Sequence, residues 1–218
     1  RRMSFDDPHG AEPVLEAGAP LDRARLAVIM AHGRGAAADD MIALARALRV
    51  SDVAYLAPQA AGRAWYPYPF MTEIARNEPG LSSALRRIES VIARAGEAGL
   101  GPDRVVLMGF SQGACLSLEC AARHARRYAG IVGLSGGLIG PPGTPRDYPG
   151  SFDGTPVFLG CSDVDPHIPL HRVRESAEVF RRMGARVDER IYPGMAHTVN
   201  LEEISAVRAM LAAAGPST

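Results

Sequence analysis

The sequence predicts an α/β fold, a single domain with a mostly parallel central sheet and helices on both of its faces. Short apolar runs without polar residues, such as Leu26–Ala31, are typical of strands that are buried on both sides. Longer segments whose apolar residues recur at helical spacing, such as 81–95, separate these runs along the whole chain. The 218 residues suffice for one domain with a large core, and we find no internal repeat. We therefore treat residues 1–218 as one domain.

In chain order, strands and helices alternate. Residues 1–20 form a polar leader rich in Pro and Gly, with a possible edge strand at Val14–Ala17. Further strands are expected at 26–31, 53–57, 104–108, 131–134, 157–160 and 187–192, the last nearer an edge because polar and apolar residues alternate in it. Helices are expected from Asp39–Asp40 onward, over 81–95 and 114–125, over a segment ending near 184, and from about 201. Asn200 and Glu203 match a capping box at the start of the last helix.

Composition excludes several classes of function. Lys plus Arg number 24 and Asp plus Glu number 24, so the formal net charge is zero and no basic excess exists for binding nucleic acid. No apolar run approaches the length that spans a membrane, and the N-terminus lacks the pattern of a signal peptide. Three cysteines are best explained as buried free thiols in a reducing compartment. We expect a cytoplasmic protein without stable membrane insertion, and the sequence leaves open whether it is a monomer or a homodimer.

The strongest motif is Gly109-Phe110-Ser111-Gln112-Gly113, which follows an apolar strand and precedes a helical segment. A sharp strand-to-helix turn with serine at its apex is the nucleophile elbow of an α/β-hydrolase. The flanking glycines are expected because a Cβ on either side would collide with neighbouring backbone. A second match surrounds Ser135, but Gly and Pro residues follow it and cannot form a helix. Ser111 is therefore the candidate nucleophile, and Ser135 is assigned to a turn beside the site.

The remaining polar candidates follow other strands. In a parallel sheet the carboxyl ends of the strands share one rim, where ligands bind. Asp163 and Asp165 follow the strand at 157–160, and His197 follows the strand at 187–192. The order Ser, Asp, His is that of the α/β-hydrolase triad. His197 is the candidate general base, and either aspartate could orient it; spacing alone does not separate them.

An oxyanion hole needs two backbone N–H groups aimed at the developing negative charge. One is expected from Gln112, the residue after the nucleophile, and the other from Arg34 in the turn His32-Gly33-Arg34-Gly35. The turn lacks the glycine patterns of dinucleotide-binding and P-loop phosphate sites, so a phosphate role is not favoured. The acidic pair lacks the spacing of a calcium loop, and we expect no metal.

These residues together resemble the phospholipase/carboxylesterase family, which includes acyl-protein thioesterases and small bacterial carboxylesterases. The matching pieces, in order along most of the chain, are His32-Gly33-Arg34-Gly35, Ala57-Pro58-Gln59, Trp65, Gly109–Gly113, Asp163-x-Asp165-Pro166-x-x-Pro169 and Gly194-Met195-x-His197. The resemblance implies that the aspartate before the proline, Asp165, is the catalytic one. It also implies a compact hydrolase without a large cap domain, a metal or a cofactor.

The sequence departs from the family pattern in two places. Family members often have leucine where Arg34 stands and an aspartate shortly after the tryptophan, whereas here Tyr66-Pro67-Tyr68-Pro69-Phe70 follows Trp65. This difference favours an acyl pocket of another shape over one for a long lipid or an S-acylated protein. We hypothesise that Trp65, Tyr66 and Phe70 wall the substrate site; the alternative is aromatic packing beneath a long loop.

The sequence thus predicts a serine hydrolase that cleaves a small-molecule carboxylic ester through a Ser-His-Asp triad and an acyl-enzyme. A peptidase or a thioesterase would use the same triad, and only the pocket shape would distinguish these enzymes from an esterase. A third hypothesis is a non-catalytic protein of the same fold that binds a small ligand; such proteins usually lack a triad member.

Overall fold

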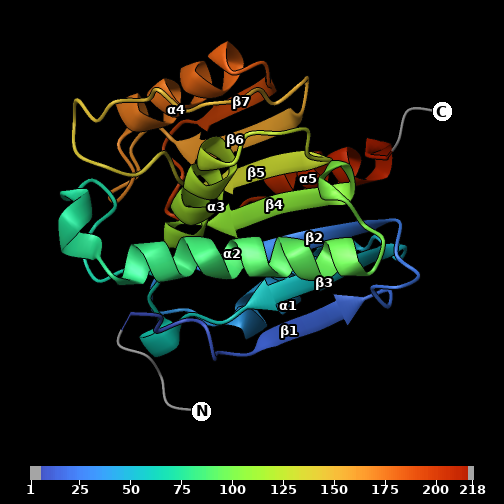
Figure 1. Cartoon of the computed structure of the whole chain (residues 1–218). Helices are drawn as coiled ribbons and strands as arrows, with labels where there is room; N and C mark the ends of the chain where they lie inside the picture. Colours follow the sequence, from blue (N-terminus) through green and yellow to red (C-terminus); the bar gives the residue numbers. More distant parts are fainter. Residues whose placement is uncertain (1–5, 216–218) are drawn as a thin grey trace.

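The computed structural model describes residues 6–215 of the chain, which form one seven-stranded sheet flanked by helices (Figure 1). The strand order is β1-β3-β2-β4-β5-β6-β7, and every neighbouring pair is parallel except β1 with β3. The strands are β1 Val14–Gly18, β2 Leu26–Ala31, β3 Val53–Pro58, β4 Val105–Phe110, β5 Gly130–Leu134, β6 Pro156–Ser162 and β7 Arg186–Tyr192. The predicted mostly parallel α/β sheet is confirmed.

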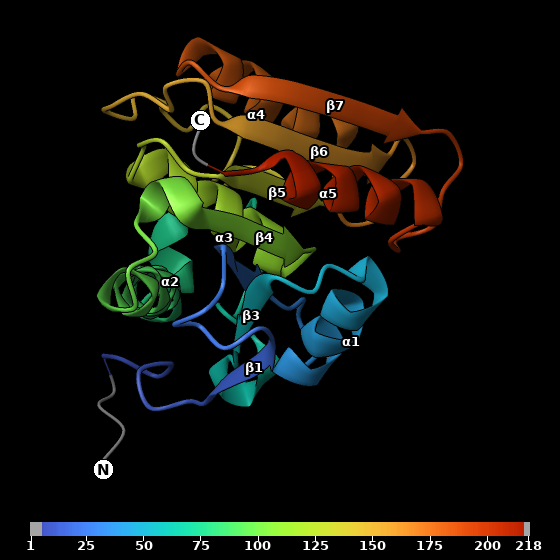
Figure 2. The same cartoon turned by 90° about the vertical axis from the view of Figure 1, so that its right-hand side faces the viewer.

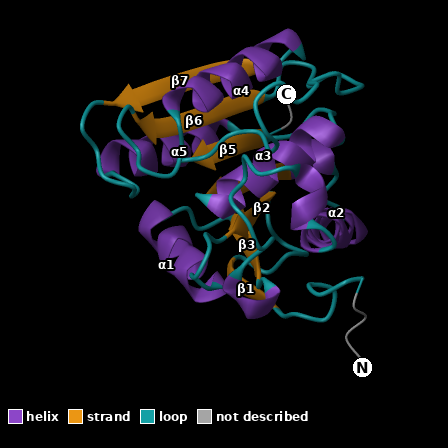
Figure 3. Cartoon of the chain, turned by 90° about the vertical axis from the view of Figure 1, so that its left-hand side faces the viewer, coloured by secondary structure: helices purple, strands orange, loops and turns teal. Residues whose placement is uncertain are grey.

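The helices cover both faces of the sheet. Figures 2 and 3, which view the molecule from opposite ends, show α1 and α5 on one face and α2, α3 and α4 on the other. Their bounds are α1 Ala38–Leu48, α2 Gly80–Glu97, α3 Gln112–Arg123, α4 Leu170–Arg182 and α5 Leu201–Ala213. Short 3₁₀ helices at Ala61–Arg63, Ile74–Asn77 and Pro102–Arg104 lie in the connections. None of the helices in residues 6–215 is both long and apolar enough to cross a bilayer.

Two apolar cores sandwich the sheet. In β2, Ala27 and Ile29 belong to the core under α2, α3 and α4, whereas Val28 and Met30 belong to the core under α1 and α5. Successive side chains of a strand point to opposite faces, so a strand with helices on both sides must be apolar throughout. This requirement explains why the sequence signal of the central strands was a continuous run rather than an alternation.

The two edges of the sheet differ from its centre. The expected edge strand in the leader is β1, whose Val14 pairs with Pro58 at the end of β3. At the other edge, β7 is only partly buried, in accord with its alternating sequence. The first five residues of the leader, together with 216–218, lie outside the described residues.

The last helix begins as the capping box predicted. Asn200 Oδ1 accepts the backbone N–H of Glu203 at 2.8 Å, and Glu203 Oε1 accepts that of Asn200 at 3.1 Å. These two bonds satisfy donors that have no partner within the helix. The helix start is thereby fixed directly after the β7–α5 loop, which carries His197.

Candidate active site

Three side chains from separate loops meet at the carboxyl rim of the sheet. Ser111 follows β4, Asp165 lies between β6 and α4, and His197 lies between β7 and α5. His197 Nε2 is 2.8 Å from Ser111 Oγ, and His197 Nδ1 is 2.6 Å from Asp165 Oδ2. An ionised carboxylate only accepts hydrogen bonds, so Nδ1 carries the ring proton and Nε2 is free to accept the serine proton. This is the arrangement that a serine nucleophile requires.

The structure distinguishes the two aspartates that spacing could not. The Asp165 side chain is 0% exposed, and its Oδ1 accepts the N–H groups of His167 and Ile168 at 2.8 and 2.9 Å. Asp163 Oδ1 instead accepts the N–H of Gly194 at 2.8 Å. Asp165 therefore orients the histidine, as the family resemblance implied. Asp165 also makes the local turn bonds, while Asp163 ties the β7–α5 loop to the β6–α4 loop.

Ser111 has the backbone of a nucleophile elbow. Its φ is 56° and its ψ is −120°, a conformation that a residue with a side chain rarely adopts. A Cβ at Gly109 would lie 2.2 Å from the carbonyl oxygen of Gly113, and one at Gly113 would lie 2.0 Å from that of Ala31. Only glycine fits at these two positions. The tight turn presents the serine hydroxyl outward at the start of α3.

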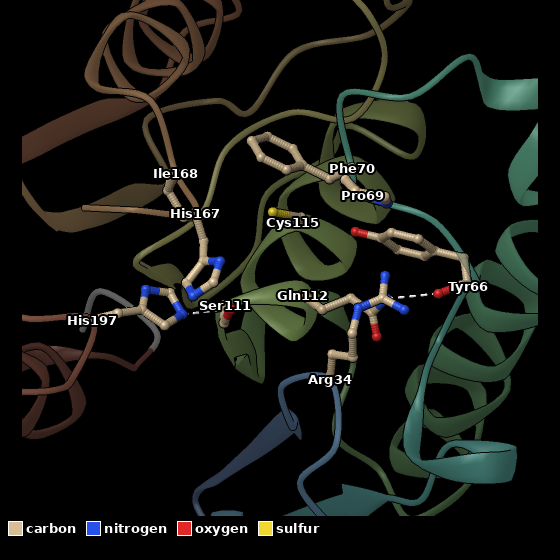
Figure 4. A pocket seen from close by; sticks show the side chains of 10 residues that line it. All are labelled: Arg34, Tyr66, Pro69, Phe70, Ser111, Gln112, Cys115, His167, Ile168 and His197. Carbon is tan, nitrogen blue, oxygen red and sulfur yellow. Dashed lines mark hydrogen bonds between the residues drawn. The ribbon is translucent and has the colours of Figure 1, made fainter. Parts of the chain in front are cut away.

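A cavity of about 280 Å³ opens beside Ser111 (Figure 4). Tyr66 and Phe70 form part of its wall, and the Tyr66 hydroxyl points across it toward Cys115. Burial raises the pKa of the Cys115 thiol to about 12, so this sulfur stays protonated at neutral pH and is a poor nucleophile. The lining residues are Arg34, Tyr66, Pro69, Phe70, Ser111, Gln112, Cys115, His167, Ile168 and His197.

Comparison with known proteins agrees with this geometry. The model of the phospholipase/carboxylesterase family matches residues 14–214. A solved structure of a phospholipase/carboxylesterase from Dyadobacter fermentans DSM 18053 is 41% identical, has a TM-score of 0.89, and aligns with 93% of this chain and 97% of its own. The chain belongs to the phospholipase/carboxylesterase family. The predicted resemblance is confirmed, and membership makes the protein a hydrolase of esters or thioesters.

Proteins named acyl-protein thioesterase 1 are more distant relatives in this family. The one from Saccharomyces cerevisiae is 28% identical over 215 residues, 87% of this chain and 93% of that protein. The one from Gibberella zeae is 34% identical over 143 residues, 63% of this chain and 60% of that protein. The second match therefore spans less than two thirds of the relative's length.

The turn His32-Gly33-Arg34-Gly35 packs against Ser111. A Cβ added at Gly33 would lie 3.4 Å from Ser111 Cβ, so the backbone of residues 33–34 runs directly past the serine. Gln112 is the first residue of α3, and its N–H is one of the donors that a helix start leaves without an intrahelical partner. The backbone N–H groups of Arg34 and Gln112 remain the expected donors of the oxyanion hole.

The structure corrects our hypothesis for Trp65. This side chain is 0% exposed and does not line the cavity; its ring packs between His9 and His32, with ring centroids 5.2 and 5.1 Å away. Its Nε1 donates to the His32 carbonyl at 2.9 Å. A buried indole N–H needs a partner, and the oxyanion turn supplies one. Trp65 thus supports this turn from behind, and of the three aromatic residues only Tyr66 and Phe70 reach the cavity.

Two buried histidines hold Trp65 in place. His32 Nε2 accepts the N–H of Ala60 at 3.0 Å, so its Nδ1 donates to the Gly33 carbonyl at 2.7 Å. His9 likewise accepts through Nδ1 from Ala61 and donates through Nε2 to the Trp65 carbonyl. Burial lowers the pKa of both histidines, which favours these neutral forms. His32 therefore shapes its own turn. The role of His9 was not anticipated, because no motif in the leader sequence surrounds it.

Sequence analysis also missed His167 and the side chain of Gln112. The His167 ring lines the cavity and meets the His197 ring edge-on at 4.9 Å. The Gln112 side chain accepts the backbone N–H of Trp65 through Oε1 at 2.7 Å and donates to the Tyr66 carbonyl through Nε2 at 2.9 Å. The only available signals were the position of His167 beside the acid and that of Gln112 beside the nucleophile.

The connection 136–154 is fastened to the body of the protein by buried charges. Arg172, 1% exposed, donates to the carbonyls of Leu138 and Gly140, and Glu119, 2% exposed, accepts the N–H of Ile139 and the hydroxyl of Tyr148.

Ser135, the second serine in a Gly-x-Ser-x-Gly match, is fully buried at the end of β5 and is not followed by a helix. Among residues 6–215, no group of three His, Cys, Asp or Glu side chains is arranged to hold a metal ion.

Proposed function

We propose that the protein is a serine carboxylesterase that cleaves small carboxylic esters through an acyl-enzyme on Ser111. The observation that carries the proposal is the unbroken pair of hydrogen bonds from Ser111 through His197 to Asp165. All three groups are in place without rearrangement, and the cavity opens at the serine hydroxyl. This arrangement favours catalysis over the simple binding of a ligand.

In the first half of the reaction, Ser111 Oγ attacks the ester carbonyl while His197 Nε2 takes its proton. The N–H groups of Arg34 and Gln112 stabilise the oxyanion, and each such donor contributes about 2.7–4 kcal/mol in the transition state. His197 then protonates the alcohol oxygen, the carbon–oxygen bond breaks, and the acyl group remains on Ser111. Asp165 keeps His197 in the correct tautomer and stabilises the imidazolium.

In the second half, His197 removes a proton from water, and the resulting attack on the acyl carbon releases the acid and restores Ser111. The cavity volume of about 280 Å³ lies just below the usual range of about 300–1,000 Å³ for small-molecule sites. Tyr66 and Phe70 close it on the side away from His197 (Figure 4). Short acyl groups are therefore the favoured substrates.

The test is a panel of p-nitrophenyl esters from acetate to palmitate, extended by a thioester and a phospholipid. The wild-type protein should have its highest kcat/KM on short acyl chains, and Ser111→Ala should lose about 10⁴-fold or more. A fluorophosphonate probe should label the wild-type protein and not Ser111→Ala. Labelling that persists in the variant would place the nucleophile elsewhere and refute the proposal.

A second candidate, thioesterase activity, is favoured by the relatives named acyl-protein thioesterase 1. A thioester follows the same steps with a thiolate as leaving group, so the triad does not distinguish the two. The ratio of kcat/KM for a thioester and an oxygen ester with the same acyl chain decides between them. We expect the oxygen ester of a short acid to compete well, because the cavity is small for a long S-acyl chain.

We further propose that the protein works in a reducing compartment such as the cytoplasm, with small-molecule esters rather than nucleic acids as partners. The support is that Cys115, Cys120 and Cys161 are all buried as free thiols. Cell fractionation tests the compartment, and native mass spectrometry decides between a monomer and a homodimer.

A further inference from the structure

One wall of the cavity carries a permanent positive charge. Arg34 is the only arginine or lysine among the lining residues, and the rest of the lining is largely aromatic, aliphatic or neutral. No carboxylate in residues 6–215 forms an ion pair with its guanidinium. No aspartate or glutamate lines the cavity. A guanidinium without a counter-ion beside a small cavity is suited to bind an anion.

The guanidinium is also fixed in place. Its Nη1 donates to the Pro67 carbonyl at 2.8 Å, and its Nη2 donates to the Tyr68 carbonyl at 2.9 Å. It lies over the Tyr66 ring, with Cζ 6.0 Å from the ring centroid. A guanidinium has five N–H donors, so these two bonds leave others for a ligand. Because the side chain is already ordered, little conformational entropy is lost when an anion binds.

The chemistry of the triad tells which part of a substrate meets Arg34. His197 must reach the leaving oxygen in order to protonate it, so the alcohol lies on the side of His197 and His167. The acyl group then extends to the opposite side of Ser111. Figure 4 shows Arg34, Tyr66 and Phe70 on that side, away from His197. The positive charge thus faces the acyl portion and not the alcohol.

We propose that Arg34 selects substrates whose acyl group ends in a carboxylate, that is, half-esters of short dicarboxylic acids. The inference rests on the proposed esterase function and names the substrate class of the same site. Arg34 then serves twice: its backbone N–H binds the oxyanion, and its guanidinium binds the distal carboxylate. Water is the only other reactant, and the products are the dicarboxylate, the alcohol and one proton that is released to solvent.

The experiment compares pairs of ethyl esters that differ only at the end of the acyl chain. Monoethyl succinate, glutarate and adipate are set against ethyl butanoate, pentanoate and hexanoate, and the released acid is measured by chromatography. Hydrogen bonds to charged groups are worth enough for a preference of roughly 10- to 150-fold in kcat/KM for the best-fitting half-ester. The preference should shrink with added salt, because an open site is screened.

Variants separate the side-chain role from the backbone role, since substitution at 34 keeps the N–H. Arg34→Leu should reduce the ratio of kcat/KM for the half-ester to kcat/KM for the neutral ester to about one, and Arg34→Lys should retain part of the preference. This ratio is informative even if the loss of the hydrogen bonds from Arg34 to Pro67 and Tyr68 slows the hydrolysis of both substrates. Arg76→Leu is the matched control. Arg76 is exposed, lies over the Tyr68 ring and does not line the cavity, so its loss should leave the ratio unchanged.

Binding gives a readout without turnover. Ser111→Ala should bind monoethyl glutarate more tightly than ethyl pentanoate in a calorimetric titration, and adding Arg34→Leu should remove the difference. If the wild-type protein hydrolyses both members of each pair equally, the role of Arg34 is refuted while the esterase function stands. If it hydrolyses no ester and a fluorophosphonate does not label Ser111, the esterase function itself fails.

Discussion

Asp165→Asn is the substitution that tests the site most directly, because the structure dictates how the new amide would lie. In the wild-type protein, Asp165 Oδ1 accepts two backbone N–H groups and Oδ2 accepts the Nδ1 proton of His197. An amide keeps one acceptor oxygen, and the two backbone donors hold that oxygen. Its NH₂ group then faces His197 Nδ1 and forces the ring proton to Nε2, opposite Ser111 Oγ. An imidazole in this tautomer cannot accept the serine proton.

The size of the effect follows from the bonds at stake. Turning the amide over to restore the tautomer would leave the two backbone donors unpaired, at about 1–3 kcal/mol each. Loss of the charge-assisted bond to the imidazolium adds about 1.5–3 kcal/mol. These contributions sum to about 3.5–9 kcal/mol, so kcat/KM should fall by roughly 10³-fold or more.

The assay is kcat/KM on p-nitrophenyl acetate together with the rate of fluorophosphonate labelling, and thermal unfolding serves as a check that the variant is folded. Asp163→Asn is the matched control. Its amide oxygen can still accept the N–H of Gly194, so we expect a loss of less than about tenfold. The reasoning is refuted if Asp165→Asn stays within tenfold of the wild-type rate, or if Asp163→Asn loses as much.

Three further predictions concern stability. Gly113→Ala should lower the free energy of unfolding by about 3 kcal/mol or more, because the new Cβ would meet the Ala31 carbonyl. Gly96→Ala is the control: this residue lies on α2 with open space around it, so the substitution should raise the free energy of unfolding by about 0.5–1 kcal/mol. Denaturant titration measures both values. Glu119→Ala should lower the free energy of unfolding by about 3–5 kcal/mol, because the N–H of Ile139 and the hydroxyl of Tyr148 lose their acceptor. Amide hydrogen exchange should accelerate first in residues 138–148. Burial raises the pKa of Glu203 from 4.5 to about 7, so the folded state binds the proton more tightly and stability should fall as pH rises between these values. Glu203→Gln should remove that slope and be more stable than wild type above pH 7 by up to roughly 3 kcal/mol; equal stability at pH 8 would contradict the assignment.

The sequence predicted the sheet and the triad because both depend on local rules. A strand buried on two faces must be apolar throughout, and an elbow needs glycine where backbones touch, so Leu26–Ala31 and Gly109–Gly113 could be recognised without coordinates. The shared rim of a parallel sheet then brought Ser111 and His197 together from far apart in the chain. The choice between Asp163 and Asp165 depended on the family resemblance, because two carboxylates in one loop satisfy the same spacing argument.

The buried residues that support the site from outside the triad could not be predicted, because their contacts join distant segments that share no local sequence pattern. His9 bonds to Trp65 across 56 positions, and Arg172 bonds to Leu138 across 34. Trp65 illustrates the difficulty. An aromatic residue in a long loop near the site is equally compatible with a wall and with a buried support, and only the position of His9 and His32 on either side of the ring decides.

The same segment links substrate selection to catalysis. Two side chains between them bond to the backbone of all four consecutive residues 65–68: Gln112 bonds to Trp65 and Tyr66, and Arg34 bonds to the carbonyls of Pro67 and Tyr68. These two residues are also the proposed oxyanion donors through their backbone N–H groups. A substrate that moves the wall of the pocket therefore pulls on the side chains of both donors. We therefore expect a poorly fitting acyl chain to lower kcat as well as to raise KM.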